Sequence, residues 1–329
     1  MDAILQTLPI AKQQEELVQC MISEAATTSG IEGEFLSRQD LMSSIKNKLK
    51  LNVIPETVRD KRSIAISNLL VVVRNSYNRK LTEKDIKLWH GLLFANKAGQ
   101  WRSGTELMQV VSGMYGKETV HYEAPPSYRV PVEMKQFVHW YNAFKITDNP
   151  VDVLIKTAVA HLYFESIYPF EDGNGRIGRA IAEKCLAQSL GRPVLLSLSS
   201  VIERNKKQYY TALKEAQTSL EITGWIVYFA NVIKQAQTEA IETVRFSLRK
   251  TVFFDRYKNE LNEREMKAIG KMLDAGIEGF EGGMTAKKYM HINRTSKATA
   301  TRDLQHLSKI GVLSAQSGGR SQYYELNMD

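Results

Sequence analysis

The sequence predicts a mainly α-helical protein with a small β-hairpin, followed by a separate, smaller C-terminal unit. Three observations predict this fold class. Apolar residues recur at helical spacing through most of the first 250 residues. Residues 99–126 instead form short alternating runs that glycines punctuate, as in a hairpin. Residues 260–329 combine three helical patterns with two strand-like segments.

Two buried helices are predicted to meet at a glycine-rich corner, Pro169–Arg179. The first helix follows Pro150, which suits a first turn, and the second is stopped by Gly191 and Pro193. Glycine in the corner allows backbone N–H groups to converge without a Cβ between them. The apolar positions of the two helices are Val151, Leu154, Ile155, Ala158, Val159, Leu162 and Ile167, and then Ile177, Ile181, Cys185, Leu186 and Leu190.

The charges of this corner predict an anion site. Arg176 and Arg179 are three residues apart, so they share one face of the first turn of the second helix. That end of a helix already carries partial positive charge and unpaired N–H donors, so two cations there favour a bound anion. Asp172 adds an oxygen ligand of the kind that Mg²⁺ shares with phosphates. The stretch lacks the Gly-Lys-Ser/Thr of a Walker A loop. The alternative is a Gly/Asn turn whose two arginines pair with core carboxylates.

The corner resembles the signature of the Fic/Doc family, His-Pro-Phe-x-Asp/Glu-Gly-Asn-Gly-Arg-x-x-Arg, at every defining position from Pro169 to Arg179. Most of that family transfer AMP from ATP-Mg to a hydroxyl of a protein. The resemblance implies that Asp172 binds Mg²⁺ and that Arg176 and Arg179 hold the α/β- and γ-phosphates of ATP. It also implies an anion cradle, which is formed by Asn174 and the amides of Gly173 and Gly175.

One signature position differs, because Tyr168 stands where the family has its catalytic histidine. That histidine is the general base for the incoming hydroxyl. An unperturbed tyrosine has a pKa of about 10, so only about 0.1 % is ionised at neutral pH. General base catalysis typically contributes about 10²–10⁴-fold. The sequence therefore predicts an intact nucleotide site with impaired chemistry. His161, seven residues upstream, is too far along the helix to substitute by spacing alone.

A second resemblance lies near the N-terminus. Residues 3–27 have a helical pattern, and Thr27–Glu34 is typical of a turn with a capping hydroxyl. Thr28, Glu32 and Gly33 also match the Ser/Thr-x-x-x-Glu-Gly/Asn segment that inhibits many Fic proteins. The resemblance implies that Glu32 pairs with Arg179 and obstructs the γ-phosphate. The alternative is an ordinary turn.

The hairpin of residues 99–126 is predicted to turn near Gly113–Lys117, between strands at Leu107–Val111 and Thr119–Tyr122. In the Fic family this place holds the flap, which aligns the target by strand addition; a purely structural hairpin is the alternative. Within the helical pattern of residues 82–94, Thr82 and Asp85 form a cap region, and His90 is interpreted as a packed core histidine. The other helical patterns are residues 63–77, 132–144, 206–219 (with Tyr209 and Tyr210, where relatives place residues near the nucleotide base) and 223–250.

The C-terminal unit resembles a winged helix-turn-helix domain. Its helical patterns include Ala286–Met290 and Ser296–Ile310, and two strands flank Gly318-Gly319. Residues 285–320 hold seven basic residues and one acidic residue, a net charge of +6 out of the +8 of the whole chain. A clustered basic face favours nucleic acid, whereas the alternative is a solvated face for protein contacts or dimerisation. The basic residues are Lys287, Lys288, Arg294, Lys297, Arg302, Lys309 and Arg320, and the acidic one is Asp303.

Composition and length limit the remaining possibilities. The 329 residues allow two or three domains, predicted as residues 1–100 (helical, with the inhibitory segment), 101–250 (Fic-like core) and 251–329 (winged helix). Cys20 and Cys185 are isolated, which excludes a disulfide framework and suits a reducing cytoplasm. No signal peptide pattern is present, and Leu69–Val73, the longest strongly apolar run, is too short to cross a membrane.

The expected function is a self-inhibited protein adenylyltransferase with ATP and Mg²⁺ as cofactors. Its acceptor would be a Ser, Thr or Tyr hydroxyl of a protein or of the chain itself. The alternative is a catalytically silent nucleotide-binding regulator that acts through its winged helix on DNA or on a protein, and a homodimer is compatible with either function. Tyr168 is the residue that discriminates between them.

Overall fold

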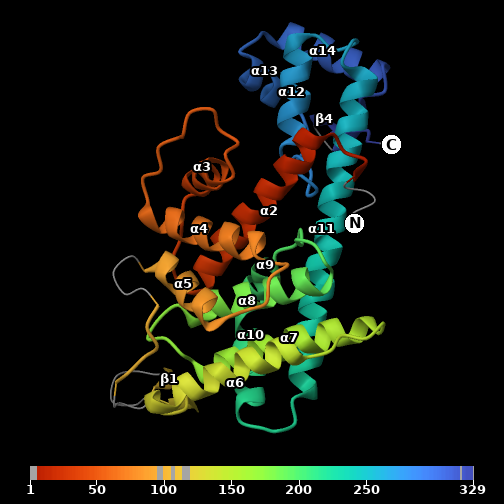
Figure 1. The fold of residues 1–329 in the computed structure, drawn as a ribbon. Helices are drawn as coiled ribbons and strands as arrows, with labels where there is room; N and C mark the ends of the chain where they lie inside the picture. Colours follow the sequence, from red (N-terminus) through yellow and green to blue (C-terminus); the bar gives the residue numbers. More distant parts are fainter. Residues whose placement is uncertain (1–5, 95–98, 105–107, 113–118, 319–320, 329) are drawn as a thin grey trace. The chain divides into compact units, whose positions relative to one another are not determined.

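The computed structural model describes residues 6–94, 99–104, 108–112, 119–318 and 321–328 (Figure 1). The chain divides into two units, one of residues Gln14–Glu239 and one of Met1–Gln13 with Ala240–Asp329. The divisions fall inside the two long helices α2 and α11, at Ile10–Ile31 and Thr223–Tyr257. The mainly α-helical prediction is confirmed. No helix among the described residues is long and apolar enough to span a membrane.

The larger unit is a helical bundle. The predicted helices are present, with boundaries that shift by a few residues at each end. In Figure 1, α6, α7 and α8 lie next to one another in the yellow to green part of the ribbon. Besides α2 and α11, the elements of this unit are α3 Arg38–Lys48, α4 Lys61–Asn75, α5 Glu83–Leu93, β1 Gln109–Ser112, β2 Thr119–Glu123, the 3₁₀ turn η1 Ser127–Arg129, α6 Val130–Ala143, α7 Pro150–Ile167, α8 Asn174–Ser189, α9 Leu198–Arg204 and α10 Lys206–Gln217.

Helices α7 and α8 carry the centre of the core. Helix α7 begins at Pro150 behind the capping side chain of Asn149, which accepts a hydrogen bond from the Val151 amide. Their inner residues pack with those of α2, α4, α5 and α6 into one apolar cluster, which fixes the corner between the two helices. Fully buried members include Trp89, Phe137, Tyr141, Phe164, Phe170, Ile177 and Ile181.

The N-terminal region differs from its prediction in three ways. The helix predicted from residue 3 is interrupted at Thr7–Pro9, and α2 begins at Ile10. Helix α2 continues to Ile31, although Thr27–Gly30 has the composition of a turn, because hydroxyl groups there bond within the structure: Thr27 donates to the Ser23 carbonyl at 2.7 Å. Helix α3 was not predicted, since its sequence is mostly polar. It forms because Ser37 caps its first turn and its apolar residues Leu41 and Ile45 are fully buried.

The predicted hairpin is present as an antiparallel pair of β1 and β2, with an irregularity between Val110 and Val111. Its predicted turn, Gly113–Lys117, falls outside the described residues. Tyr122 of β2 donates a hydrogen bond to the carbonyl of Ser166 near the end of α7, at 2.5 Å. This contact ties the hairpin to the helix that leads into the corner.

The smaller unit contains α12 Glu263–Leu273, α13 Ala286–Asn293, α14 Lys297–Lys309 and the antiparallel strands β3 Leu313–Gly318 and β4 Ser321–Leu326. Ser296 is the N-cap of α14, and the predicted turn lies partly outside the described residues. Asp303 is buried: it accepts hydrogen bonds from Arg264 (2.9 Å) and from the hydroxyl of Tyr289 (3.0 Å). The one acidic residue of the basic stretch is therefore an internal group of this unit.

Candidate nucleotide site

The corner is built around Asn174, the first residue of α8. Its Oδ1 accepts from the Phe170 amide at 3.0 Å, and its Nδ2 donates to the Phe170 carbonyl at 2.7 Å. Gly173 before it has a φ of 85°, in the left-handed region that glycine adopts without strain. The side chain of Asn174 therefore holds the loop Phe170–Gly173 in shape, and the glycine completes the turn into the helix.

Arg179 is nearly inaccessible, with 1 % of its side chain exposed. Its Nη2 contacts a carboxylate oxygen of Glu32 at 2.7 Å, and its Nε donates to the hydroxyl of Thr28 at 2.8 Å. Burial alone would lower the pKa of Arg179, but the charge of Glu32, with further contributions from Tyr209 and Glu165, raises it above its ordinary value. The predicted contact between Glu32 and Arg179 is thus present, as an ion pair whose cation is buried and whose carboxylate is partly exposed.

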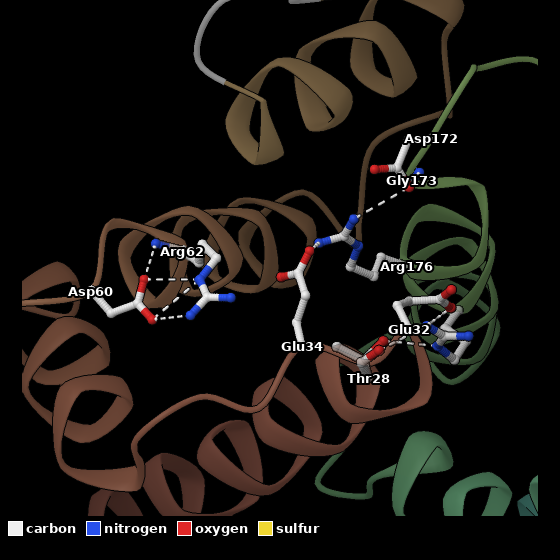
Figure 2. A network of polar contacts seen from close by, with 9 residues as sticks. Thr28, Glu32, Glu34, Asp60, Arg62, Asp172, Gly173 and Arg176 are labelled. Carbon is white, nitrogen blue, oxygen red and sulfur yellow. Dashed lines mark hydrogen bonds and ion pairs between the residues drawn. The ribbon is translucent and has the colours of Figure 1, made fainter.

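Arg176 is 5 % exposed and lies between two other carboxylates (Figure 2). Its Nη1 contacts Glu34 at 2.9 Å, and its Nη2 is 3.6 Å from Asp172. Its guanidinium also lies over the ring of Phe94, 5.2 Å from the centroid. The two arginines do have carboxylate partners, but these come from the N-terminal segment and the loop, and are 27–72 % exposed rather than part of the core.

The N-terminal segment reaches the corner through a defined helix end. The Glu34 amide donates to the Ser29 carbonyl (2.9 Å) and the Gly33 amide to the Gly30 carbonyl (3.0 Å), and Gly33 has a φ of 82°. These bonds are a Schellman motif, in which Gly33 takes the left-handed position after the helix. Lys206 of α10 donates to the Ile31 carbonyl of the same turn. The need for a left-handed residue is the physical reason for glycine after Glu32.

Tyr168 ends α7 in the left-handed conformation, with a φ of 50°. Its carbonyl accepts a hydrogen bond from Nε of Arg102 at 2.8 Å, and the Arg102 amide donates to the carbonyl of Pro169 at 2.9 Å. Burial raises the pKa of the Tyr168 hydroxyl to about 12, with further contributions from the negative charges of Glu165 and Glu32. At neutral pH this hydroxyl is protonated.

Two sets of comparisons decide the family. Residues 80–186, which include the whole corner, match the model of the Fic/DOC family. They form a Fic domain. Residues 2–51 match a second model, described as a domain of unknown function (DUF4172). A probable protein adenylyltransferase of Aquifex aeolicus (strain VF5) is 34 % identical over 96 residues, which is 29 % of this chain and 27 % of the relative. The chain therefore spans about a quarter of that relative's length.

Solved structures agree on the fold. A Fic family protein from Desulfovibrio desulfuricans G20 matches with a TM-score of 0.56 at 19 % identity, over 98 % of this chain and 89 % of that one. A Fic-domain-containing signalling protein from Bacteroides thetaiotaomicron VPI-5482 also gives 0.56, at 18 % identity, over 73 % and 94 % of the two chains. Fic-1 of C. elegans gives 0.52 at 20 % identity, over 75 % and 70 %.

The Fic domain's corner fits a phosphate-bearing ligand. Arg176 Nε is buried without a hydrogen-bond partner among the described residues. A Cβ on Gly175 would collide with the Glu32 carboxylate. Because Gly175 has no Cβ, an anionic group can approach the backbone at the start of α8 closely. No group of three or more potential metal ligands occurs in the described part of the chain. Asp172 alone suits Mg²⁺, which takes few protein ligands and shares phosphate oxygens.

His161 is engaged in the core of the larger unit rather than at Tyr168. Its Nε2 is 2.9 Å from the hydroxyl of Tyr209, and its ring stacks on Phe229 and Trp225. Burial lowers its pKa to about 3, so it is neutral. His90 is likewise the packed core residue that was predicted: it is buried, and its ring stacks on Phe170 at 4.0 Å between centroids.

The sequence analysis missed two acidic residues near the arginines. Glu34 was passed over, although it lies two residues beyond Glu32. Glu165 is buried in α7 against Gly178, and burial raises the pKa of its carboxyl to about 8. An acidic residue within the apolar pattern of α7 was the available signal. Because Glu165 is mostly protonated at neutral pH, Glu32 is the principal anion beside Arg179.

Proposed function

We propose that this chain is a Fic-type protein adenylyltransferase scaffold, which binds ATP with Mg²⁺ and is self-inhibited through Glu32. The ion pair between Glu32 and Arg179 is the observation that carries the proposal. A buried cation at the start of α8 needs an anion. The anion comes from a segment outside the signature, so a phosphate can take its place.

Each residue of the corner then has a role in nucleotide binding. Arg176 would hold the α- and β-phosphates, and Arg179 the γ-phosphate once Glu32 moves away. The amides of Gly173 and Gly175 would line the phosphates, while Asn174 keeps the loop in shape. Asp172 would hold Mg²⁺, which neutralises phosphate charge when bound. The family resemblance, the exposure of Asp172 and the two arginines at the helix end support these assignments.

The transfer step needs a proton acceptor. The oxygen of a Ser, Thr or Tyr hydroxyl would bond to the α-phosphorus, pyrophosphate would leave, and the hydroxyl proton would pass to a base. Tyr168 stands at the base position, and its raised pKa makes its hydroxyl a proton donor at neutral pH. We therefore assign weak or absent transfer to the unaltered chain. The hairpin β1–β2, held to α7 through Tyr122, would align the acceptor segment.

Loss of Arg176 tests whether this corner is the nucleotide site. In a Glu32→Gly background, Arg176→Ala should weaken ATP binding by about 10-fold or more, because charge-assisted hydrogen bonds to phosphate are lost. Isothermal titration of the full chain with ATP and Mg²⁺ measures this. Arg129→Ala, which removes an exposed arginine paired with Glu133, is the matched control and should change the affinity less than about 3-fold. Equal affinity for Arg176→Ala and its parent would place the nucleotide elsewhere.

A second candidate function, the silent regulator, is favoured by two observations. One is the protonated Tyr168. The other is the surface of the smaller unit, which we interpret as a winged helix that contacts DNA, a protein or a second copy of the chain. Lys287, Arg294, Lys297, Arg302 and Lys309 are exposed there, whereas Asp303 is buried. No acidic residue of the same stretch therefore offsets these five charges at the surface. Arg320 lies outside the described residues.

If this basic face binds DNA, the affinity of the full chain for duplex DNA should fall steeply as salt rises, because phosphate contacts release counterions. Lys297→Ala and Arg302→Ala, in the first half of α14, should each reduce the slope of log K against log salt by about 1. Fluorescence anisotropy across a salt series measures this, with Lys271→Ala on α12 as the control. A flat salt dependence, or no binding at low salt, would favour a protein contact instead.

A further inference from the structure

The helix end that presents Glu32 presents a second carboxylate to the corner. In the Schellman motif, Glu32 is the C-cap residue, Gly33 follows in the left-handed conformation, and Glu34 closes the turn through its amide. The chain reverses at Gly33, so side chains two residues apart both reach the start of α8. Glu32 contacts Arg179 at 2.7 Å. Glu34 contacts Arg176 at 2.9 Å (Figure 2).

The Glu34 contact is the closest ion pair of Arg176. Asp172 is farther away, at 3.6 Å, and 72 % of its side chain is exposed, so solvent screens its charge more strongly. The Nε of Arg176 is buried without a partner among the described residues. The guanidinium therefore depends mainly on Glu34 for neutralisation, and a phosphate at this position would compete with that carboxylate.

Glu34 also has an alternative partner. It lies in the segment between α2 and α3, and Figure 2 shows it between Arg176 and Arg62 of α4. The pKa of Arg62 is raised, first by its hydrogen bond and ion pair with Asp60, and then by the charge of Glu34. The Arg62 side chain is 56 % exposed and is paired with Asp60, and its guanidinium can still attract a second carboxylate. A Glu34 carboxylate displaced from Arg176 would therefore turn toward another cation.

We propose that Glu34 is a second determinant of nucleotide binding, which competes for Arg176 with the phosphates nearest the nucleoside. This inference rests on the proposed function of the corner. Glu32, opposite the γ-phosphate position, opposes triphosphates in particular. Glu34 opposes diphosphates and triphosphates alike, because both carry the phosphates that Arg176 would hold. Together the two carboxylates offset the charges of the two arginines when no nucleotide is bound.

Nucleotide titrations separate the two glutamates. Glu34→Gln in the full chain should lower the dissociation constants of both ADP and ATP, with Mg²⁺ present, by about 10- to 100-fold, since one charge-assisted contact no longer has to be broken. Glu32→Gln should lower that of ATP by a similar factor and change that of ADP less than about 3-fold. Glu171→Gln, which removes an exposed acidic residue of the same loop, is the control and should change neither by more than about 3-fold.

The outcomes distinguish this proposal from the proposed function. If Glu34→Gln leaves ADP binding unchanged or weaker while Arg176→Ala abolishes it, the corner binds nucleotide but Glu34 only positions Arg176, and the inference is overturned. If the Glu32→Gln/Glu34→Gln double variant is folded by circular dichroism and binds neither nucleotide, both proposals fail. Glu34→Asp separates charge from length: it should resemble the unaltered chain only if the shorter carboxylate still reaches Arg176.

Discussion

Transfer of AMP should increase by about 10²–10⁴-fold when Tyr168→His is introduced into a Glu32→Gly background, the usual range for a positioned general base. The Tyr168 hydroxyl has a pKa raised to about 12 and cannot accept a proton at neutral pH. A histidine titrates near pH 6.5 and can. The measurement is incorporation of AMP, from ATP labelled in its α-phosphate, into the chain itself or into an added protein.

Two further measurements test whether the gain in AMP transfer comes from proton transfer to residue 168. Tyr168→Phe in the same background removes the hydroxyl without supplying a base, so it should give no gain. Residual transfer through ionised Tyr168 should rise about tenfold per pH unit below its pKa, whereas transfer by the histidine variant should level off above about pH 7. Robust transfer by the unaltered chain at neutral pH would show that another base acts. No gain in the histidine variant, with ATP still bound, would favour the silent regulator.

Removal of the carboxylate beside Arg179 should strengthen ATP binding. Glu32→Gly is expected to lower the dissociation constant for ATP with Mg²⁺ by about 10- to 100-fold, because the buried cation then lacks its anion until the γ-phosphate arrives. The same loss should lower the melting temperature of the variant without nucleotide. Saturating ATP should then raise that temperature by more than it does in the unaltered chain.

Glu32→Gln is the matched variant for this test. It keeps the shape of the side chain and removes its charge, so it separates electrostatics from the backbone freedom that glycine adds before Gly33. Both variants should move ATP affinity in the same direction. If neither changes ATP affinity and neither raises residual transfer in the Tyr168→His background, Glu32 is not inhibitory.

Most of the fold was predictable because it depends on local periodicity. The apolar spacing of α7 and α8 and the cap of Thr82 with Asp85 are properties of neighbouring residues, and both are present in the structure. Helix α3 was missed because its stability comes from burying only a few residues against α4. The end of α2 was misplaced because the hydroxyl of Thr27 bonds within the helix and that of Thr28 accepts from Arg179, which lies 151 residues further along the chain.

The residues of the candidate site that belong to the signature motif were predictable from the sequence. The contacts that depend on how distant segments fold together were not. The positions of Arg176 and Arg179 follow from three-residue spacing on one helix. The contact of Glu34 with Arg176 spans 142 residues and depends on the reversal of the chain at Gly33. The two hydrogen bonds by which the Asn174 side chain holds its own loop likewise cannot be predicted from a sequence pattern. Such long-range pairings require the folded chain.

Gly33, the left-handed residue at the end of α2, makes the contacts of Glu32 and Glu34 with the two arginines easy to lose by mutation. One glycine fixes the direction from which two carboxylates arrive, so most replacements of Gly33 would displace both, since a Cβ is strained at a φ of 82°. Substitutions of Thr28, Glu32 or Glu34 would each remove one contact. None of these positions belongs to the signature. Random change in this segment would therefore remove the block on the nucleotide site far more often than strengthen it, whereas transfer would still lack a base while Tyr168 stays in place.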